Sequence, residues 1–179
     1  MRQFFVAAAA ATVLVGVSFA QTRADDVVLK GTHLCCDMCV SNVGKTLKGV
    51  DGVTGAKCDK DKKTVSFTAK DEKVAAAALK ALAAAGFFGT ATKDDKEFKI
   101  DVPEVKKGTK ADTVTVTDVH VCCGNCKDGI AKALKDLKVE VEYDGDTAMK
   151  TLKVTGKDLD GATVLEALRK GGYNGTIGK

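Results

Sequence analysis

Two short stretches of the sequence gather thiols and an imidazole at the same spacing. Residues 33–39 read HLCCDMC and residues 120–126 read HVCCGNC, so each holds one histidine and three cysteines. A bond between neighbours such as Cys35 and Cys36 would close almost no loop, which makes them poor structural disulfides. Clustered thiols favour chemistry, and thiolate sulfur selects soft cations over hard ones. The two stretches therefore predict metal-binding or redox sites.

These stretches are parts of one internal repeat. A shift of 87 positions aligns them, and the match continues, with one residue dropped, to Gly86 and Gly172. It predicts a duplicated domain of about 65 to 70 residues. The aligned candidate ligands are His33, Cys35, Cys36 and Cys39 in the first copy and His120, Cys122, Cys123 and Cys126 in the second.

Composition divides the chain into four segments. The stretch between the two copies is charged and holds the only proline, as is typical of a linker. The predicted segments are 1–20, a signal peptide; 25–93, a first metal-binding domain; 94–112, a charged linker; and 113–179, a second metal-binding domain.

The amino terminus has the pattern of a cleaved export signal. Arg2 is followed by an uncharged apolar run from Phe4 to Val17 and by a small-x-small cleavage site that ends at Ala20. The run is 14 residues long, short of the roughly 20 that span a bilayer. We therefore expect a periplasmic or secreted protein without stable membrane insertion once the signal is removed.

Charge and motif content exclude several classes of function. Without Arg2 the chain has 27 Lys and Arg against 24 Asp and Glu, a net charge of +3 that is mixed along the sequence. This balance is too weak to indicate nucleic-acid binding. The sequence has no Ser-His-Asp set and no glycine-rich phosphate loop, so we predict that the protein is not an enzyme.

Hydrophobic periodicity gives the same order of elements in each copy. Val114 and Val116 alternate as in a strand, and apolar residues then recur at helical spacing after the cysteines. A hairpin pattern follows, then a second helix that begins after Asp71 in the first copy, then a short strand. This order predicts an α+β protein with two tandem ferredoxin-like βαββαβ sandwiches. The apolar positions shift from Val114 and Val116 to Val119 and Val121, which predicts a bulge or a longer loop before the second cysteine stretch.

In that order the cysteines lie in the loop from the first strand to the first helix. Cys36 and Cys39, like Cys123 and Cys126, then straddle a helix amino terminus. Free backbone N–H groups and the positive end of the helix dipole favour a thiolate there. Such a pair can turn both sulfurs toward one soft cation.

The pattern resembles the heavy-metal-associated domain family, which includes copper chaperones, metal-pumping ATPases and the periplasmic mercury-binding protein. Leu34 and Val121 take the position of the family's Met before the CxxC pair, and Phe87 and Tyr173 match an aromatic residue that lies over the metal. The resemblance implies one soft ion per domain and a partner that is a metal-transporting membrane protein or chaperone. Core packing is the alternative role for the two aromatic residues.

The sequence also departs from the family's loop. Cys35 and Cys122 replace its Thr or Ser, and His33 and His120 replace its Gly. Some zinc-pumping members begin the loop with two adjacent cysteines, which implies that the extra thiol is a ligand. Three thiolates and one imidazole would complete a tetrahedral zinc shell, whereas two or three thiolates alone suit Cu(I). A filling role for the thiols and a hydrogen-bonding role for the histidines stay open.

We therefore expect an exported protein that captures, buffers or hands on a thiophilic cation, with Cu(I) or Zn(II) ahead of Cd(II) and Hg(II). The alternative is a periplasmic thiol-disulfide redox protein that uses the CxxC pairs. A third hypothesis, a structural zinc module, predicts that the metal-free chain is unfolded. Cys58 has no counterpart in the second copy and is expected to be a free thiol on a strand.

Overall fold

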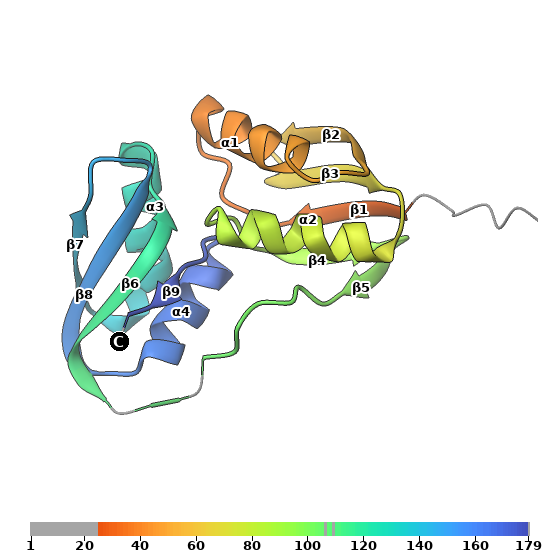
Figure 1. Cartoon of the computed structure of the whole chain (residues 1–179). Coiled ribbons are helices and arrows are strands. Elements are labelled where there is room, and N and C mark those ends of the chain that lie inside the picture. Colours follow the sequence, from red (N-terminus) through yellow and green to blue (C-terminus); the bar gives the residue numbers. More distant parts are fainter. Residues whose placement is uncertain (1–24, 106, 109, 179) are drawn as a thin grey trace, which may run out of the picture.

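The computed structural model describes residues 25–105, 107–108 and 110–178 (Figure 1). The predicted signal peptide, residues 1–20, lies outside this part of the chain. The described residues form two antiparallel sheets and four α-helices, which confirms the predicted mixture of helices and antiparallel sheets. None of these helices is long and apolar enough to cross a membrane.

The first sheet and its two helices come from the amino-terminal copy. The sheet has the strand order β2-β3-β1-β4-β5, so the first strand of the chain lies in the middle. The elements are β1 Asp25–Lys30, α1 Asp37–Lys48, β2 Val53–Asp59, β3 Thr64–Ala69, α2 Glu72–Ala84, β4 Thr90–Lys93 and β5 Lys96–Phe98.

The second sheet repeats this arrangement without the fifth strand. Its order is β7-β8-β6-β9, and a short 3₁₀ turn, η1 Lys135–Leu137, follows the first helix. The remaining elements are β6 Ala111–His120, α3 Gly124–Leu134, β7 Glu140–Asp144, β8 Met149–Leu159, α4 Gly161–Lys170 and β9 Thr176–Ile177.

Strands overlap both ends of the predicted linker 94–112, with β5 at one end and the first two residues of β6, Ala111 and Asp112, at the other. Residues 96–98 pair with β4 through the register Ala91 to Phe98, so part of the predicted linker 94–112 belongs to the first sheet. Asp94 and Asp95 form the turn with φ of 47° and 62°, a left-handed conformation that aspartate tolerates better than most residues. This tight turn returns the chain along β4.

Local sequence signals account for the helix starts. The Asp71 carboxylate caps α2 by accepting a hydrogen bond from the Val74 N–H, as expected from the sequence. In the second copy the cap is Asp160, which accepts from the N–H groups of Ala162 and Thr163. The sequence placed this start near Asp158, two residues early.

The predicted bulge is confirmed in β6. The register with β8 shifts between Val116 and Val119, and Asp118 between them has φ of 59°. The inserted residue turns Val119 and Val121 toward the core, where both are buried. The strand thereby delivers the chain to the second cysteine stretch.

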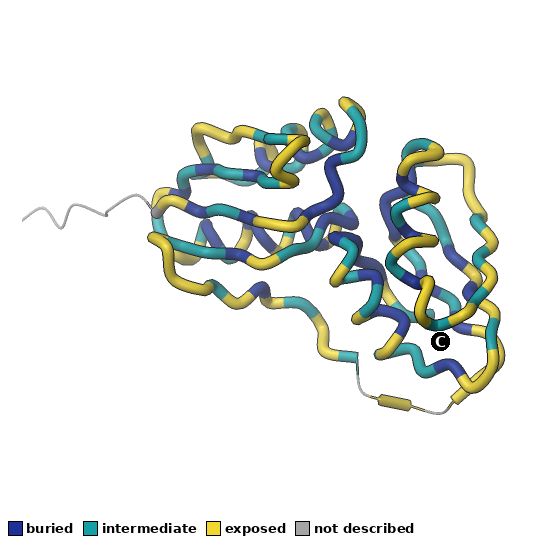
Figure 2. The backbone as a smooth tube through the Cα atoms, turned by 180° about the vertical axis from the view of Figure 1, so that it is seen from behind, coloured by how far each residue is buried: buried dark blue, intermediate teal, exposed yellow. Residues whose placement is uncertain are grey.

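The two units pack through the loops that carry the cysteines and the turns that follow α2 and α4. Figure 2 shows buried residues on the inner sides of the helices and strands and in the connection from β1 to α1. Phe87 and Tyr173 form an antiparallel bridge between the units. The buried residues of both units form a single apolar cluster.

Candidate metal centre

The cysteines of each unit lie at the start of a helix. Cys36 is the N-cap of α1 and Cys39 lies in its first turn; Cys123 and Cys126 hold the same places in α3. The sulfur atoms are 3.7 Å apart in the first pair and 4.0 Å apart in the second. Each CxxC pair therefore turns both sulfurs to one side, next to the positive end of a helix.

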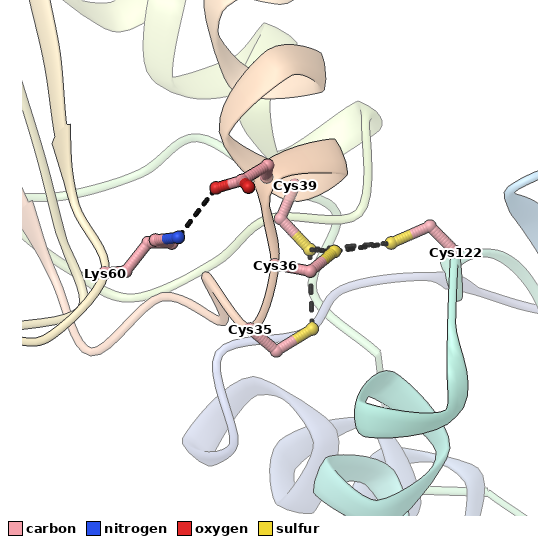
Figure 3. A network of polar contacts seen from close by, with 6 residues as sticks. Cys35, Cys36, Cys39, Lys60 and Cys122 are labelled. Atoms are coloured by element: carbon pink, nitrogen blue, oxygen red, sulfur yellow. Dashed lines mark hydrogen bonds and ion pairs between the residues drawn. The ribbon is translucent and has the colours of Figure 1, made fainter.

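The six cysteines of the two stretches meet in one place. The sulfur of Cys35 is 3.2 Å from that of Cys126, and the sulfur of Cys122 is 3.4 Å from that of Cys36 and 3.6 Å from that of Cys39. Figure 3 shows the cysteines of the first unit facing Cys122 of the second. We call Cys35, Cys36, Cys39, Cys122, Cys123 and Cys126 the six-sulfur cluster.

The cluster has a buried floor and a more open rim. Cys39 and Cys126 are fully buried, at 0% exposure, while the other four cysteines are half-buried. Cys35 lines one surface pocket, and Cys122 and Cys123 line a second that also contains the exposed Met38. An incoming ion or thiol can therefore reach the rim, whereas the floor is shielded from water.

The pKa values of two thiols, one in each unit, are lowered. Contact with the Cys39 thiol outweighs the effect of burial and lowers the pKa of Cys126 to about 4. Burial acts to raise the pKa of Cys36, but the Cys39 backbone N–H and the neighbouring thiols lower it to about 7. Thiolates, the form that binds metal, are therefore present at neutral pH.

The remaining shifts run the other way. Burial, followed by contact with other thiols, raises the pKa of Cys35 and of Cys122. Contact with the Cys126 thiolate, followed by burial, raises the pKa of Cys39. A negative charge held on Cys126 disfavours a second one close by, so without a cation these thiols keep their protons.

Both predicted histidine ligands lie in the interface beside Cys39. A ring nitrogen of His33, one of His120 and the Cys39 sulfur lie within 4.8 Å of one another. The Nδ1 of His33 donates a hydrogen bond of 2.7 Å to the Gly172 carbonyl, which leaves Nε2 with a lone pair in the neutral ring. The Nε2 atoms of both rings are buried without a hydrogen-bond partner. Burial lowers the pKa of His33 to about 4 and also lowers that of His120.

Aromatic rings of both units hold His33 in place. Its ring stacks on Phe87 at 4.7 Å and on Tyr173 at 4.0 Å between centroids, with interplanar angles of 12° and 15°. The Tyr173 hydroxyl donates a 3.1 Å hydrogen bond to the Cys126 carbonyl. Phe87 and Tyr173 are 1% and 2% exposed, so they pack between the two units and support the histidine and the cysteine loop.

Two glycines allow the backbones of the two units to approach closely. Gly86 and Gly172 follow α2 and α4 with φ of 85° and 87°. A Cβ on Gly86 would lie 2.6 Å from the backbone nitrogen of His120, and a Cβ on Gly172 would lie 2.5 Å from the backbone nitrogen of His33. Each unit thus places a glycine against the histidine of the other, as in a two-fold symmetric dimer.

Backbone hydrogen bonds repeat this reciprocity. The Phe88 N–H donates to the Gly172 carbonyl, and the Asn174 N–H donates to the Gly86 carbonyl, both at 3.0 Å. The Asn174 side chain adds a bond to the Ala83 carbonyl at the end of α2. The sequence alone does not reveal this interface, because a glycine after a helix is already explained by the helix end.

One ion pair lies next to the cluster on the first unit's side. Lys60 forms a 2.6 Å ion pair with Asp37, which directly follows Cys36 (Figure 3). Cys58 is a half-buried free thiol on β2, as expected, and burial raises its pKa. It belongs to none of the metal-ligand groups formed by the described residues.

Comparisons with known proteins add little to this geometry. The sequence matches no protein-family model and no curated protein. Among solved structures, the chain is similar to the N-terminal soluble domains of Bacillus subtilis CopA, with 19% identity and a TM-score of 0.33 over 88% of this chain and 95% of that one. It is also similar to the regulatory subunit of aspartate kinase from Thermus flavus, with 16% identity and a TM-score of 0.29 over 83% and 89%. Both TM-scores are below 0.5, so we draw no functional conclusion from either protein.

Proposed function

We propose that this is an exported protein that captures, buffers or hands on a thiophilic cation, and that both units contribute ligands to one shared site. The observation that carries the proposal is the six-sulfur cluster, in which cysteines from two distant stretches approach to 3.2 Å. Thiolates in this number select soft ions, with Cu(I) or Zn(II) as the first candidates.

The fold supports this function. We propose that residues 25–93 and 113–179 are tandem ferredoxin-like domains of the heavy-metal-associated type, without catalytic activity. Each carries its CxxC pair at the start of its first helix, where Cys36 and Cys123 are the N-caps. A shared site revises the expectation of one ion held separately by each domain.

Binding and release proceed by ligand exchange. An ion enters at the half-buried rim, where a thiol loses its proton as the metal–sulfur bond forms, and then reaches the buried Cys39 and Cys126. For handover, a thiolate of the acceptor bonds to the ion before a rim thiolate such as Cys36 leaves. The oxidation state of the metal does not change in either step.

Whether the histidines bind the ion determines whether the site favours storage or handover. Ligation by Nε2 of His33 or His120 would close the coordination shell and slow exchange, whereas a supporting role leaves the ion open to an incoming thiolate. The export signal predicted at residues 1–20 places the protein in the periplasm or outside the cell. A metal-transporting membrane protein or a chaperone is the corresponding partner.

Native mass spectrometry of the reduced mature protein tests the function. Anaerobic titrations with Cu(I) and with Zn(II), each against a competing chelator, should give tightly bound metal in the wild type. The double variant Cys36→Ser, Cys123→Ser should lose most of this uptake, while Cys58→Ser, which changes a thiol outside the cluster, should retain it. Equal uptake by all three proteins would contradict the proposed site.

The redox alternative predicts a different result. A thiol-disulfide oxidoreductase would accelerate the reduction of insulin by dithiothreitol and would not need metal. We expect no acceleration over buffer from the wild type, and none from the double variant. Catalysis that depends on Cys36 and Cys123, together with no metal uptake, would replace the metal-binding proposal.

A further inference from the structure

The sulfur atoms of the cluster have a regular arrangement, and the inference drawn from it rests on the proposed function. Four triplets of cysteines have all three sulfurs within 4.8 Å of one another, and three of the four combine cysteines from both units. The triplets are Cys35, Cys39 and Cys126; Cys35, Cys36 and Cys123; Cys36, Cys39 and Cys122; and Cys122, Cys123 and Cys126.

These triplets define a closed polyhedron. Each sulfur belongs to two triplets, and no pair of sulfurs occurs in more than one. Six points related in this way are the corners of an octahedron, and the triplets are four alternate faces of it. The sulfur pairs in closest contact, at 3.2 to 4.0 Å, all lie along edges of this octahedron.

We propose that the six-sulfur cluster binds four Cu(I) ions as one polynuclear centre. Each ion takes one triplet, so it has three sulfur ligands, and each cysteine thiolate bridges two ions. The units supply three thiolates each, and neither unit contains the full set. A centre of this kind forms only when the two units are docked.

The sulfur spacings fit three-coordinate ions. With a metal–thiolate bond of about 2.3 Å, an ion in the plane of three sulfurs holds them about 4.0 Å apart, and a linear two-sulfur ion about 4.6 Å apart. The observed contacts of 3.2 to 4.0 Å are nearer to the first value. Every sulfur group among the described residues has three members, whereas a four-cysteine zinc site needs four adjacent thiolates.

The charges and protons balance. All six cysteines bind as thiolates: those that still carry a proton release it as twelve copper–sulfur bonds form, and copper stays Cu(I). Six thiolates and four Cu(I) ions leave a net charge of −2 on the centre. Cys36 and Cys123 are the N-caps of α1 and α3, so both helix dipoles favour this negative charge.

The number of ions at saturation tests the proposal. Reduced full-length mature protein is titrated anaerobically with Cu(I) in the presence of a competing chelator and observed by native mass spectrometry. We expect a four-ion species that appears with few intermediates, and X-ray absorption should show three sulfur neighbours per copper at about 2.3 Å. Saturation at one or two ions with two sulfur neighbours would overturn the polynuclear centre but leave the proposed function intact. No copper uptake would overturn the polynuclear copper centre, and uptake of neither copper nor zinc would overturn the proposed function as well.

Three variants sharpen the test. Gly172→Val keeps every thiol but places a side chain against the His33 backbone, so it should separate the units and bind at most two ions. Cys35→Ser removes one corner of the octahedron and should lose the four-ion species, whereas Cys58→Ser should keep it. Circular dichroism verifies that the variants are folded. If Gly172→Val does not fold, the comparison of Cys35→Ser with Cys58→Ser tests the proposal by itself. A four-ion species in Cys35→Ser would refute the polynuclear centre.

Discussion

The sulfur atoms of Cys35 and Cys126 lie 3.2 Å apart although the residues are 91 positions apart in the chain. They belong to different units, and each unit has its own sheet and helices. The contact therefore depends on how the two units dock. Through this contact, the two cysteine stretches, which are separate in the sequence, form one site.

Mild oxidation should record this contact covalently. We expect the metal-free protein to form disulfides that cross between the units, with Cys35–Cys126 prominent among the peptides mapped by mass spectrometry. Gly172→Val should reduce these cross-links at least several-fold because it pushes the units apart. Oxidation that gave only bonds within each CxxC pair, in both proteins, would contradict the docked arrangement.

The buried His33 should make the metal-free protein less stable in acid. Its pKa falls from 6.5 to about 4 on folding, so the unfolded chain binds a proton between these values and the folded protein does not. Stability is therefore present above pH 6.5 and is lost as the pH falls toward 4. From pH 7 to pH 5 the loss is about 2 kcal/mol for this group.

Chemical denaturation of the wild type and of His33→Gln at pH 7 and pH 5 measures this effect. The variant lacks the titrating ring, so its stability should change less over the same interval. An equal change in both proteins would show that other groups cause the acid sensitivity.

Removal of the Tyr173 hydroxyl should destabilise the second unit. Tyr173→Phe leaves the buried Cys126 carbonyl without its 3.1 Å hydrogen bond, and we expect a loss of about 1 kcal/mol in the free energy of unfolding. Tyr143→Phe is the matched control, since its hydroxyl makes an exposed bond of 3.4 Å to the Lys127 carbonyl. A larger loss in the control would contradict the role assigned to Tyr173.

The helix caps offer substitutions that should spare the metal centre. Asp71→Ala and Asp160→Ala each remove a side-chain cap and should cost about 1 kcal/mol of stability. Both caps lie at the starts of α2 and α4, away from the cysteine loops at α1 and α3. Metal uptake should therefore match the wild type, and a loss of uptake would link these helices to the site.

Metal removal should leave the protein folded. Each unit has an apolar core, with Leu29 and Leu47 in the first and Leu134 and Leu152 in the second at 0 to 1% exposure. We expect circular dichroism to show both sheets and helices after treatment with a chelator, and a higher melting temperature when metal is bound. Loss of secondary structure without metal would instead favour the structural zinc module.

Local signals in the sequence determined much of each unit. The alternation of Val114 and Val116 and the cap at Asp71 reflect contacts within a few residues, and the repeat is a direct match between two stretches of the sequence, so all three could be predicted. The position of Cys36 and Cys123 at helix starts followed from the same order of elements. The strand β5 was missed because its three residues are charged or aromatic and carry too short a pattern.

Only the tertiary structure decided that the two cysteine stretches form one cluster. Docking depends on close approach at Gly86 and Gly172 and on the stack of His33 between Phe87 and Tyr173. These contacts join residues more than 30 positions apart, so no local periodicity in the sequence predicts them. The sequence by itself determined which residues could bind a soft metal, and the packing of two folded units determined that they face one another.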